Sequence, residues 1–340
     1  MEGSQLKPIT ILGAGSWGTA LALYLARRGQ TVRIWSVEIP EIAAMLAERT
    51  NNRYLPGFHF PDQIQPTANL AEAVKDIDDV IMAVPSIGFR DTLFMLKPLA
   101  SKHLRITCAT KGLDADTGQL LHEVVSEVLG SDCKFAVLSG PSFAREVAAG
   151  LPSAVVIASK DKTLLNDMTQ RFHSAIFGVY TTDDVVGVEV GGVVKNVIAL
   201  ATGICDGMEL GANARSALIT WGLAEIMELG KALGGKPETF IGLSGLGDLI
   251  LTCTDNQSRN RRLGLSIGKG HNIQEAEKEI GQVVEGKRNA ELVAMLAEQH
   301  HVDMPICNMV WQILQGKLNA NKALEQLLAR TSSTRSELMF

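Results

Sequence analysis

The chain has 340 residues, of which 46% are hydrophobic and 20% charged, and this composition is typical of globular proteins. At about 150 residues per domain, the length predicts two domains, each able to bury a core. The 32 basic and 37 acidic residues give a net charge of −5, whereas nucleic-acid-binding surfaces usually carry a basic excess. We therefore expect no nucleic-acid partner.

Cysteine and histidine patterns exclude several further classes. The five cysteines form no C-x-x-C pair, and the seven histidines form no H-E-x-x-H motif, so we expect neither a metal site nor a disulfide scaffold. Such thiols are typical of a reduced, cytoplasmic protein. The most apolar segment, 185–204, carries Glu189 and Lys195, which favours a buried core helix over a membrane span. We expect a homodimer with no membrane span.

The first half of the chain alternates between short β-branched runs and helical patterns. Such alternation predicts βαβ units and a mostly parallel sheet. Helices are expected near 16–28 and 41–49, and strands at Ile9–Leu12, Thr31–Trp35, Asp79–Val84, Arg105–Ala109, Phe135–Leu138 and Ala154–Ala158.

The second half changes to a nearly all-helical pattern. We expect glycine-rich loops to interrupt it at Gly242–Asp248 and Gly264–Gly270. The prediction is therefore an α/β domain over residues 1–187, a helical domain over 188–330, and a frayed tail over 331–340.

A glycine motif directly follows the first predicted strand and opens a helix. Gly13, Gly15 and Gly18 fit G-x-G-x-x-G in the strand–turn–helix context that a dinucleotide site requires. The first glycine permits the tight turn, the second lets the backbone approach a pyrophosphate, and the third allows close packing. The helix N-terminus favours the anion. The first domain is thus predicted to be a dinucleotide-binding Rossmann domain.

The choice between NAD and NADP stays open at this stage. An NAD site usually places an acid at the end of the second strand, but the segment here reads Ile34-Trp35-Ser36-Val37-Glu38, with Glu38 only nearby. Arg33 is able to reach a 2′-phosphate in one orientation, but strand alternation equally allows its side chain to point elsewhere. Because no acid ends the strand itself, we expect NADPH to be accepted at least comparably to NADH.

A single lysine lies in the apolar helix predicted over 185–204. Stepping by four residues places Lys195 on a stripe of small residues with Gly187, Gly191, Ala199 and Gly203. In one interpretation, the stripe admits a flat ring or small substrate, and burial lowers the lysine pKa into the range useful for proton transfer. In the other, the helix packs closely against another backbone and the lysine extends its charged end to water. The segment alone does not separate the two.

Candidate anion-binding groups follow two further strands and a basic stretch. The run 139–143 and Lys111 both follow predicted strands and so fall at the carboxyl edge of the sheet, where ligands bind. The segment Ser258-Arg259-Asn260-Arg261-Arg262 suits phosphate, with one arginine binding the ligand and the others binding carboxylates or water. The alternative for this segment is a solvated helix face that binds no ligand. Asp248 lies in a glycine-rich loop, where it is able to orient a lysine.

Together these segments resemble the bacterial NAD(P)-dependent glycerol-3-phosphate dehydrogenases. The similarity covers nearly the whole chain in the expected order, and its most specific part is Gly245-Leu246-Gly247-Asp248-Leu249 followed by Ser258–Arg262. The other matching segments are Gly13–Gly18, Asn52–Gly57, Lys111-Gly112, Gly140–Val147, Gly150–Pro152, Lys195-Asn196 and Val283–Gly286.

The resemblance implies an active site between a Rossmann domain and an all-α domain, and reversible reduction of dihydroxyacetone phosphate to sn-glycerol 3-phosphate for phospholipid synthesis. It implies that Lys195 is the proton donor and acceptor at the substrate C2 oxygen. The implied substrate-binding residues are Lys111, Gly140, Ser142, Lys195, Asp248, Ser258, Arg259 and Asn260. The implied cofactor-binding residues are Gly13, Gly15, Ser16, Trp17, Gly18, Lys111, Ala144, Arg259, Val283 and Glu285, for NADPH, NADH or both.

The chain departs from the family pattern at three places. Val193-Val194 stand before the lysine where Ala-Leu is usual, and Lys287 stands where an apolar residue is usual. Val37-Glu38 replace the histidine or basic residues often found after the second strand. Two rival functions are a β-hydroxyacid dehydrogenase, which lacks such an arginine loop, and a catalytically silent nucleotide sensor, which need not keep Lys195, Lys111 and Asp248 together.

Overall fold

In the computed structural model, residues 7–333 are described. Contacts within the chain divide it into two compact units, one of Met1–Thr110 and Leu121–Val185 and one of Lys111–Leu120 and Val186–Phe340. The segment 111–120, which the sequence analysis placed in the first domain, thus packs with the second unit. Of the tail predicted over 331–340, the first three residues end the last helix, and 334–340 lie outside the described residues.

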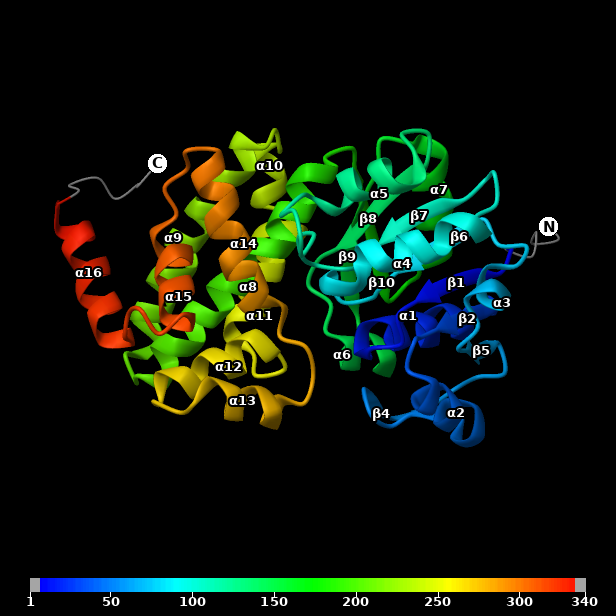
Figure 1. Ribbon diagram of the computed structural model, residues 1–340, viewed down its shortest axis with the longest axis horizontal. Coiled ribbons are helices and arrows are strands. Elements are labelled where there is room, and N and C mark those ends of the chain that lie inside the picture. Colours follow the sequence, from blue (N-terminus) through cyan, green and yellow to red (C-terminus); the bar gives the residue numbers. More distant parts are fainter. Residues whose placement is uncertain (1–6, 334–340) are drawn as a thin grey trace. The chain divides into compact units, whose positions relative to one another are not determined.

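An eight-stranded sheet forms the centre of the first unit, in the order β10-β9-β8-β7-β6-β1-β2-β5 (Figure 1). Neighbouring strands are parallel except β8 and β9, which confirms the predicted mostly parallel sheet. The strands are β1 (Ile9–Leu12), β2 (Val32–Trp35), β5 (Ile64–Thr67), β6 (Asp79–Met82), β7 (Arg105–Cys108), β8 (Lys134–Ser139), β9 (Ser153–Ala158) and β10 (Phe177–Thr182). A separate antiparallel pair joins β3 (Thr50–Asn51) to β4 (Leu55–His59).

Helices cover both faces of this sheet because the buried strand residues alternate between two apolar clusters. Ile9 and Ile11 pack on one face, and Leu12 and Met82 pack on the other. The first face is covered by α1 (Ser16–Arg27), α6 (Ala144–Ala149) and α7 (Lys162–Phe172), and the second by α3 (Leu70–Val74), α4 (Phe89–Leu96) and α5 (Leu121–Leu129). Helix α2 (Ile39–Glu48) follows β2, and short 3-10 turns lie at η1 (Ser86–Gly88) and η2 (Lys97–Leu99).

The second unit is helical in all its described elements. Its central helix, α8 (Val185–Gly207), has the length and hydropathy of a membrane span, but 94% of its apolar window is buried inside the protein, as predicted for a core helix. The others are α9 (Gly211–Ala232), α10 (Pro237–Phe240), the π-helical turn η3 (Leu243–Gly247), α11 (Asp248–Thr254), α12 (Arg259–Gly268), α13 (Ile273–Ile280), α14 (Glu285–Gln299), α15 (Pro305–Leu314) and α16 (Ala320–Ser333).

Glycines bring α8 and α12 into backbone contact. A Cβ on Gly203 would lie 2.2 Å from the Arg261 carbonyl oxygen, and one on Gly264 would lie 2.2 Å from the Leu200 oxygen. Gly207 and Gly268 face each other one turn further on. The loop predicted at Gly264–Gly270 is therefore wrong over residues 264–268, because these glycines serve helix packing rather than a turn.

Candidate functional site

The dinucleotide loop has the geometry that its three glycines predict. Gly13 has a φ of +114°, and a Cβ there would lie 2.5 Å from the Ala83 carbonyl carbon. A Cβ on Gly18 would lie 1.9 Å from the Gly13 oxygen, so loop and helix meet closely. At Gly15 a Cβ would meet nothing within 4 Å, which leaves open space beside the backbone. Each glycine thus meets the need that a pyrophosphate site imposes on it.

The first turn of α1 offers polar groups beside this loop. Helix α1 begins at Ser16, and no side chain caps its N-terminus at Gly15. The indole Nε1 of Trp17 is buried and has no hydrogen-bond partner among residues 7–333. Backbone donors at a helix N-terminus fit an anionic ligand, so the first unit fits a dinucleotide.

The other predicted first-unit residues follow β8. Gly140 has a φ of +132°, and its carbonyl oxygen accepts a hydrogen bond of 3.1 Å from the Ser142 hydroxyl. Ala144 is the first residue of the short helix α6. These residues lie at the carboxyl end of a parallel strand, as predicted.

Three predicted residues of the second unit meet in one buried cluster. The Lys195 Nζ lies 2.5 Å from Asp248 Oδ1, and the Lys111 Nζ lies 2.8 Å from Asp248 Oδ2. Lys195 comes from the middle of α8, Asp248 opens α11, and Lys111 follows β7 in sequence. The side chains of Lys195 and Asp248 are 6% and 2% exposed, so water screens neither charge.

Burial and charge act in opposite directions in this cluster. Burial lowers the pKa of the Lys195 amine to about 7, with Asp248 opposing the shift and Lys111 adding to it. Burial also acts to raise the pKa of Asp248, but the positive charges of Lys111 and Lys195 outweigh it and hold that pKa below its usual range. One carboxylate therefore stays ionised beside an amine that is able to exchange a proton near neutral pH.

Thr252 is a member of this cluster that the sequence analysis missed. Its hydroxyl accepts a hydrogen bond of 3.0 Å from the Lys195 Nζ and donates one of 2.6 Å to the Asp248 carbonyl oxygen. The available signal was its spacing, because a residue four positions after Asp248 on a helix lies over it. Thr252 thus fixes the direction in which the Lys195 amine points.

A second set of bonds joins α8, α12 and α14. Asn260 Nδ2 donates to Asn196 Oδ1 over 2.8 Å, and the Gly286 backbone N–H donates to Asn260 Oδ1 over 2.9 Å. These two bonds fix the orientation of the Asn260 side-chain amide. The helix carrying Lys195 is thereby tied to the start of α14.

Of the arginines in the basic stretch, one is committed to the protein. Arg261 pairs with Asp206 and donates to the Cys253 carbonyl oxygen over 3.1 Å. Arg262 is exposed, whereas Arg259 is partly buried and donates to Gln282 Oε1 over 3.3 Å. Burial lowers the pKa of Arg259 and Glu285 opposes this shift. Arg259 is therefore the arginine of this stretch best placed for a phosphate.

The remaining predicted residues flank Arg259. Ser258 caps α12 by accepting from the Arg261 N–H over 3.2 Å. Val283 is exposed, and Glu285 opens α14. The predicted second-unit residues are Lys111, Lys195, Asp248, Ser258, Arg259, Asn260, Val283 and Glu285.

The interpretations of the glycine stripe can be compared with these contacts. A Cβ on Gly191 would lie 2.8 Å from the Ser244 oxygen, and Gly203 packs on α12. The close backbone packing of the second interpretation therefore accounts for these two glycines, but the lysine does not extend to water as that interpretation expected, since its side chain is 6% exposed. Lys195 lies on the same helix but points to Asp248, so the lysine and the glycines have separate roles.

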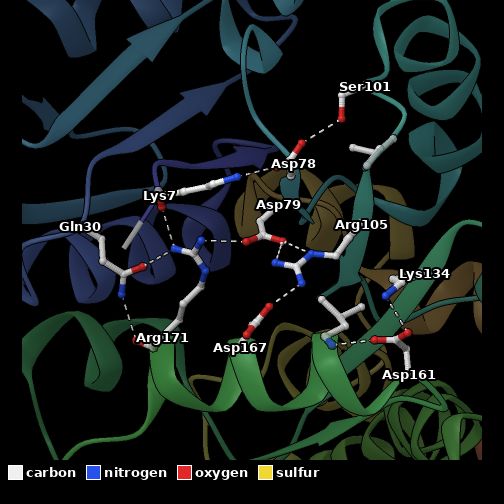
Figure 2. Close-up of polar contacts among 12 residues, drawn as sticks. Lys7, Gln30, Asp78, Asp79, Ser101, Arg105, Lys134, Asp161, Asp167 and Arg171 are labelled. Atoms are coloured by element: carbon white, nitrogen blue, oxygen red, sulfur yellow. Dashed lines mark hydrogen bonds and ion pairs between the residues drawn. The ribbon is translucent and has the colours of Figure 1, made fainter. Parts of the chain in front are cut away.

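A cavity of about 570 Å³ lies in the first unit at the opposite, amino-terminal edge of its sheet. Figure 2 shows that four of its charged side chains, Asp79, Arg105, Asp167 and Arg171, face one another. Asp79 pairs with Arg105 over 2.6 Å and with Arg171 over 2.7 Å, and Arg105 also pairs with Asp167 over 2.5 Å. We infer that this cluster holds α7 against the sheet, since Asp79, Arg105 and Arg171 find their counter-charges within the protein.

Comparison with known proteins identifies the family. Models of the NAD-dependent glycerol-3-phosphate dehydrogenase N-terminus and C-terminus match residues 8–165 and 184–325. A glycerol-3-phosphate dehydrogenase (NAD(P)+) from Idiomarina loihiensis is 48% identical, covering 97% of this chain and 99% of the relative. One from Coxiella burnetii is 50% identical, covering 95% and 97%.

Solved structures agree. The crystal structure of glycerol-3-phosphate dehydrogenase from Coxiella burnetii is 50% identical and superposes with a TM-score of 0.93, covering 95% of this chain and 98% of that one. The enzyme from Saccharomyces cerevisiae is 28% identical, with a TM-score of 0.80 and coverage of 94% and 98%. The chain therefore belongs to the NAD-dependent glycerol-3-phosphate dehydrogenase family.

Proposed function

We propose that this chain catalyses reversible hydride transfer between dihydroxyacetone phosphate and sn-glycerol 3-phosphate, with NADH or NADPH as cofactor and Lys195 as the proton donor and acceptor. The names of the relatives support the reaction and the cofactor class. The observation that carries the role of Lys195 is its buried contact with Asp248, with Lys111 on the other carboxylate oxygen. In cells, this reaction supplies the glycerol phosphate needed for phospholipids.

The cluster suits ketone reduction for an electrostatic reason. When bound, the nicotinamide cofactor supplies the hydride that the C2 carbon takes up, and negative charge then develops on the C2 oxygen. Lys195 stabilises that charge and gives the oxygen its proton, and in the reverse direction it accepts the proton. Asp248 lies between Lys195 and Lys111, so its negative charge offsets the repulsion between the two amines. The Thr252 hydroxyl accepts a hydrogen bond from the Lys195 amine and so fixes its orientation.

Substrate binding is assigned to the polar groups around these lysines and after β8. We propose that Arg259 and the N-terminal backbone of α12, with Ser258 and Asn260, bind the phosphate. From the family resemblance we further assign Lys111 to the C2 oxygen, Asp248 to the hydroxyl groups, and Gly140 and Ser142 to substrate binding. The same resemblance assigns Ser16, Trp17, Ala144, Val283, Glu285 and the glycine loop to cofactor binding. Fixing the phosphate positions the ketone for the transfer.

The reaction is tested by following nicotinamide absorbance with dihydroxyacetone phosphate and each reduced cofactor separately. We expect oxidation of the cofactor that depends on the phosphorylated ketone and is absent with unphosphorylated dihydroxyacetone at the same concentration. A β-hydroxyacid dehydrogenase would instead respond to a 2- or 3-keto acid. If the chain binds dinucleotide but turns over no ketone, the result would favour the rival function of a catalytically silent nucleotide sensor.

We further propose that the chain works as a cytoplasmic homodimer. Support for the compartment comes from its five free cysteines, four of them buried. Light scattering on the eluting peak of a sizing column measures the mass directly, and a mass of one chain would overturn the dimer.

A further inference from the structure

The end of β2 lies directly beside the dinucleotide loop. Leu12 and Trp35 are paired across β1 and β2, and the Gly13 N–H donates to the Trp35 carbonyl oxygen over 2.8 Å. In doubly wound sheets, this position meets the ribose of the cofactor's adenosine half, and an acid there binds the 2′-hydroxyl. The next residues, 36–38, end in Glu38. A role for Glu38 toward this ribose rests on the proposed use of NAD(P).

Hydrogen bonds hold Glu38 in place relative to the glycine loop. The Tyr54 hydroxyl lies 2.9 and 2.8 Å from the two carboxylate oxygens of Glu38, to which it donates. The Tyr54 N–H donates to Asn51 Oδ1 over 3.2 Å, and Asn51 Nδ2 donates to the Ala14 carbonyl oxygen over 2.8 Å. The loop, Asn51, Tyr54 and Glu38 thus form one connected chain of contacts.

The Glu38 carboxylate is still able to bind a ligand. Its side chain is 35% exposed, and a carboxylate has more acceptor positions than the one donor of Tyr54 uses. Burial and Glu38 together raise the pKa of Tyr54 to about 12, so the phenol keeps its proton and remains a donor. The apolar side chains on either side, Val37 and Ile39, are 66% and 68% exposed, which suits contact with a purine ring.

Each of the nearby arginines has partners within the protein. Arg33 donates to the carbonyl oxygens of three residues at the end of α3, over 3.0, 3.4 and 2.6 Å. Arg49 donates to two carbonyl oxygens over 2.7 and 3.0 Å. Arg53 lies 2.6 Å from a Glu41 oxygen and 3.6 Å from a Glu38 oxygen. These are the three arginines between residues 32 and 74, a segment without lysine and with five acidic residues.

We propose that Glu38 determines cofactor choice in this chain, accepting a hydrogen bond from the adenosine 2′-hydroxyl of NADH and repelling the 2′-phosphate of NADPH. NADH is therefore the preferred cofactor. This reverses the order expected from sequence, in which the strand end lacked an acid and Arg33 stood near a 2′-phosphate. The sequence did not reveal that α3 binds Arg33 or that Tyr54 fixes Glu38.

Equilibrium binding to the purified full-length chain tests this without substrate, so the result does not depend on the role of Lys195. Dissociation constants for NADH and NADPH are measured by nicotinamide fluorescence, and those for 5′-AMP and 2′,5′-ADP by competition. We expect NADH to bind at least about tenfold more tightly than NADPH, and 5′-AMP more tightly than 2′,5′-ADP. Equal affinities, or tighter NADPH, would overturn the proposal.

Variants separate charge from position. Glu38→Gln should weaken NADH binding several-fold and bring the NADPH:NADH ratio of dissociation constants close to one. The control is Glu127→Gln, which removes an acid that pairs over 2.8 Å with Arg90 of α4 and should leave this ratio unchanged. Tyr54→Phe keeps the charge of Glu38 but removes the hydrogen bond that holds the Glu38 side chain. NADH should therefore bind more weakly, while NADPH binding stays disfavoured. An unchanged ratio in folded Glu38→Gln contradicts the proposal.

The test stays decisive in three further cases. If circular dichroism shows that Glu38→Gln does not fold, the wild-type ratio and Tyr54→Phe still decide, because loss of NADPH discrimination in Tyr54→Phe would contradict the role of charge. If neither dinucleotide binds the wild-type chain, both the NAD(P) assignment and the role of Glu38 fail. If both bind without preference, the cofactor assignment stands and Glu38 alone loses its role.

Discussion

Two buried aspartates of this protein each lie between two cationic side chains, but one forms a fixed ion pair and the other lies beside an amine that titrates near neutral pH. Asp79 in the first unit binds Arg105 with one oxygen at 2.6 Å and Arg171 with the other at 2.7 Å (Figure 2). Asp248 in the second unit binds Lys195 with one oxygen at 2.5 Å and Lys111 with the other at 2.8 Å. Both carboxyl groups are nearly inaccessible, at 4% and 2% exposure.

The kind of cation makes the difference. Burial acts to lower the pKa of Arg105, but Asp79 and Asp167 outweigh it and raise that pKa above its usual range, so the guanidinium is permanently charged. Burial lowers the pKa of Lys195 to about 7 despite Asp248. The buried aspartate between arginines thus forms a fixed ion pair, whereas the one between lysines lies beside an amine whose proton is able to move.

Replacing the titrating amine should have the largest effect. Lys195→Ala removes the proton donor and the positive charge at the C2 oxygen, so we expect kcat to fall about 10²- to 10⁴-fold. The dissociation constant of NADH should change little, because the glycine loop remains. Stopped-flow single-turnover rates measure the loss. Lys195→Arg is the matched control: it keeps the charge, cannot release the proton, and should also be slow. Near-wild-type turnover in either variant would exclude the role of Lys195.

Breaking the fixed ion pair should affect stability instead of chemistry. Asp79→Asn leaves Arg171 buried without its counter-charge, and we expect the free energy of unfolding to fall by about 3–5 kcal/mol. Urea unfolding measures it, and kcat of the folded protein should be unchanged. Asp78→Asn removes the neighbouring carboxylate, which pairs with an exposed Lys7 over 3.1 Å, and should cost less than about 1 kcal/mol. Equal losses would show that burial of Asp79 is irrelevant.

The sequence predicted the first unit better than the second because the first depends on local patterns. The dinucleotide loop occupies six consecutive residues after a strand, so its chemistry and its context are visible together. The strands that were missed are short or at edges: β5 carries Pro66 and ends the sheet, and β10 forms its other edge. Edge strands lack the continuous apolar run that marks a central parallel strand.

The second unit depends on partners that are distant in sequence. Lys111, Lys195 and Asp248 come from three segments, and only the family resemblance placed them together beforehand. Glycines 264 and 268 were mistaken for a loop because their partner is the backbone of α8, more than fifty residues away. Thr252 carried a helical spacing to Asp248, but nothing in the pattern showed that Asp248 would start a helix rather than stay in a loop.

Two neighbouring arginines of the basic stretch should differ in their effect on phosphate binding. Arg259→Ala should raise the KM for dihydroxyacetone phosphate roughly tenfold to a hundredfold and change kcat less, since a charge-assisted bond to the phosphate is lost. Initial rates over a range of substrate concentrations separate the two constants. Arg262→Ala removes an exposed neighbour of the same charge and should leave KM nearly unchanged. An unchanged KM in Arg259→Ala would place the phosphate elsewhere.

The mildest perturbation is pH, which changes the protonation of the Lys195 amine. Because Lys195 has a pKa of about 7 and must be protonated to reduce the ketone, the reduction rate should fall up to tenfold per unit as pH rises above 7. Oxidation of glycerol phosphate needs the neutral amine, so its rate should rise with pH through 7 and then level off. Single-turnover rates between pH 6 and pH 9 in both directions measure this crossing. If both directions showed the same pH dependence, the proton would be coming from another group, and the contrast between Asp248 and Asp79 would be one of location alone.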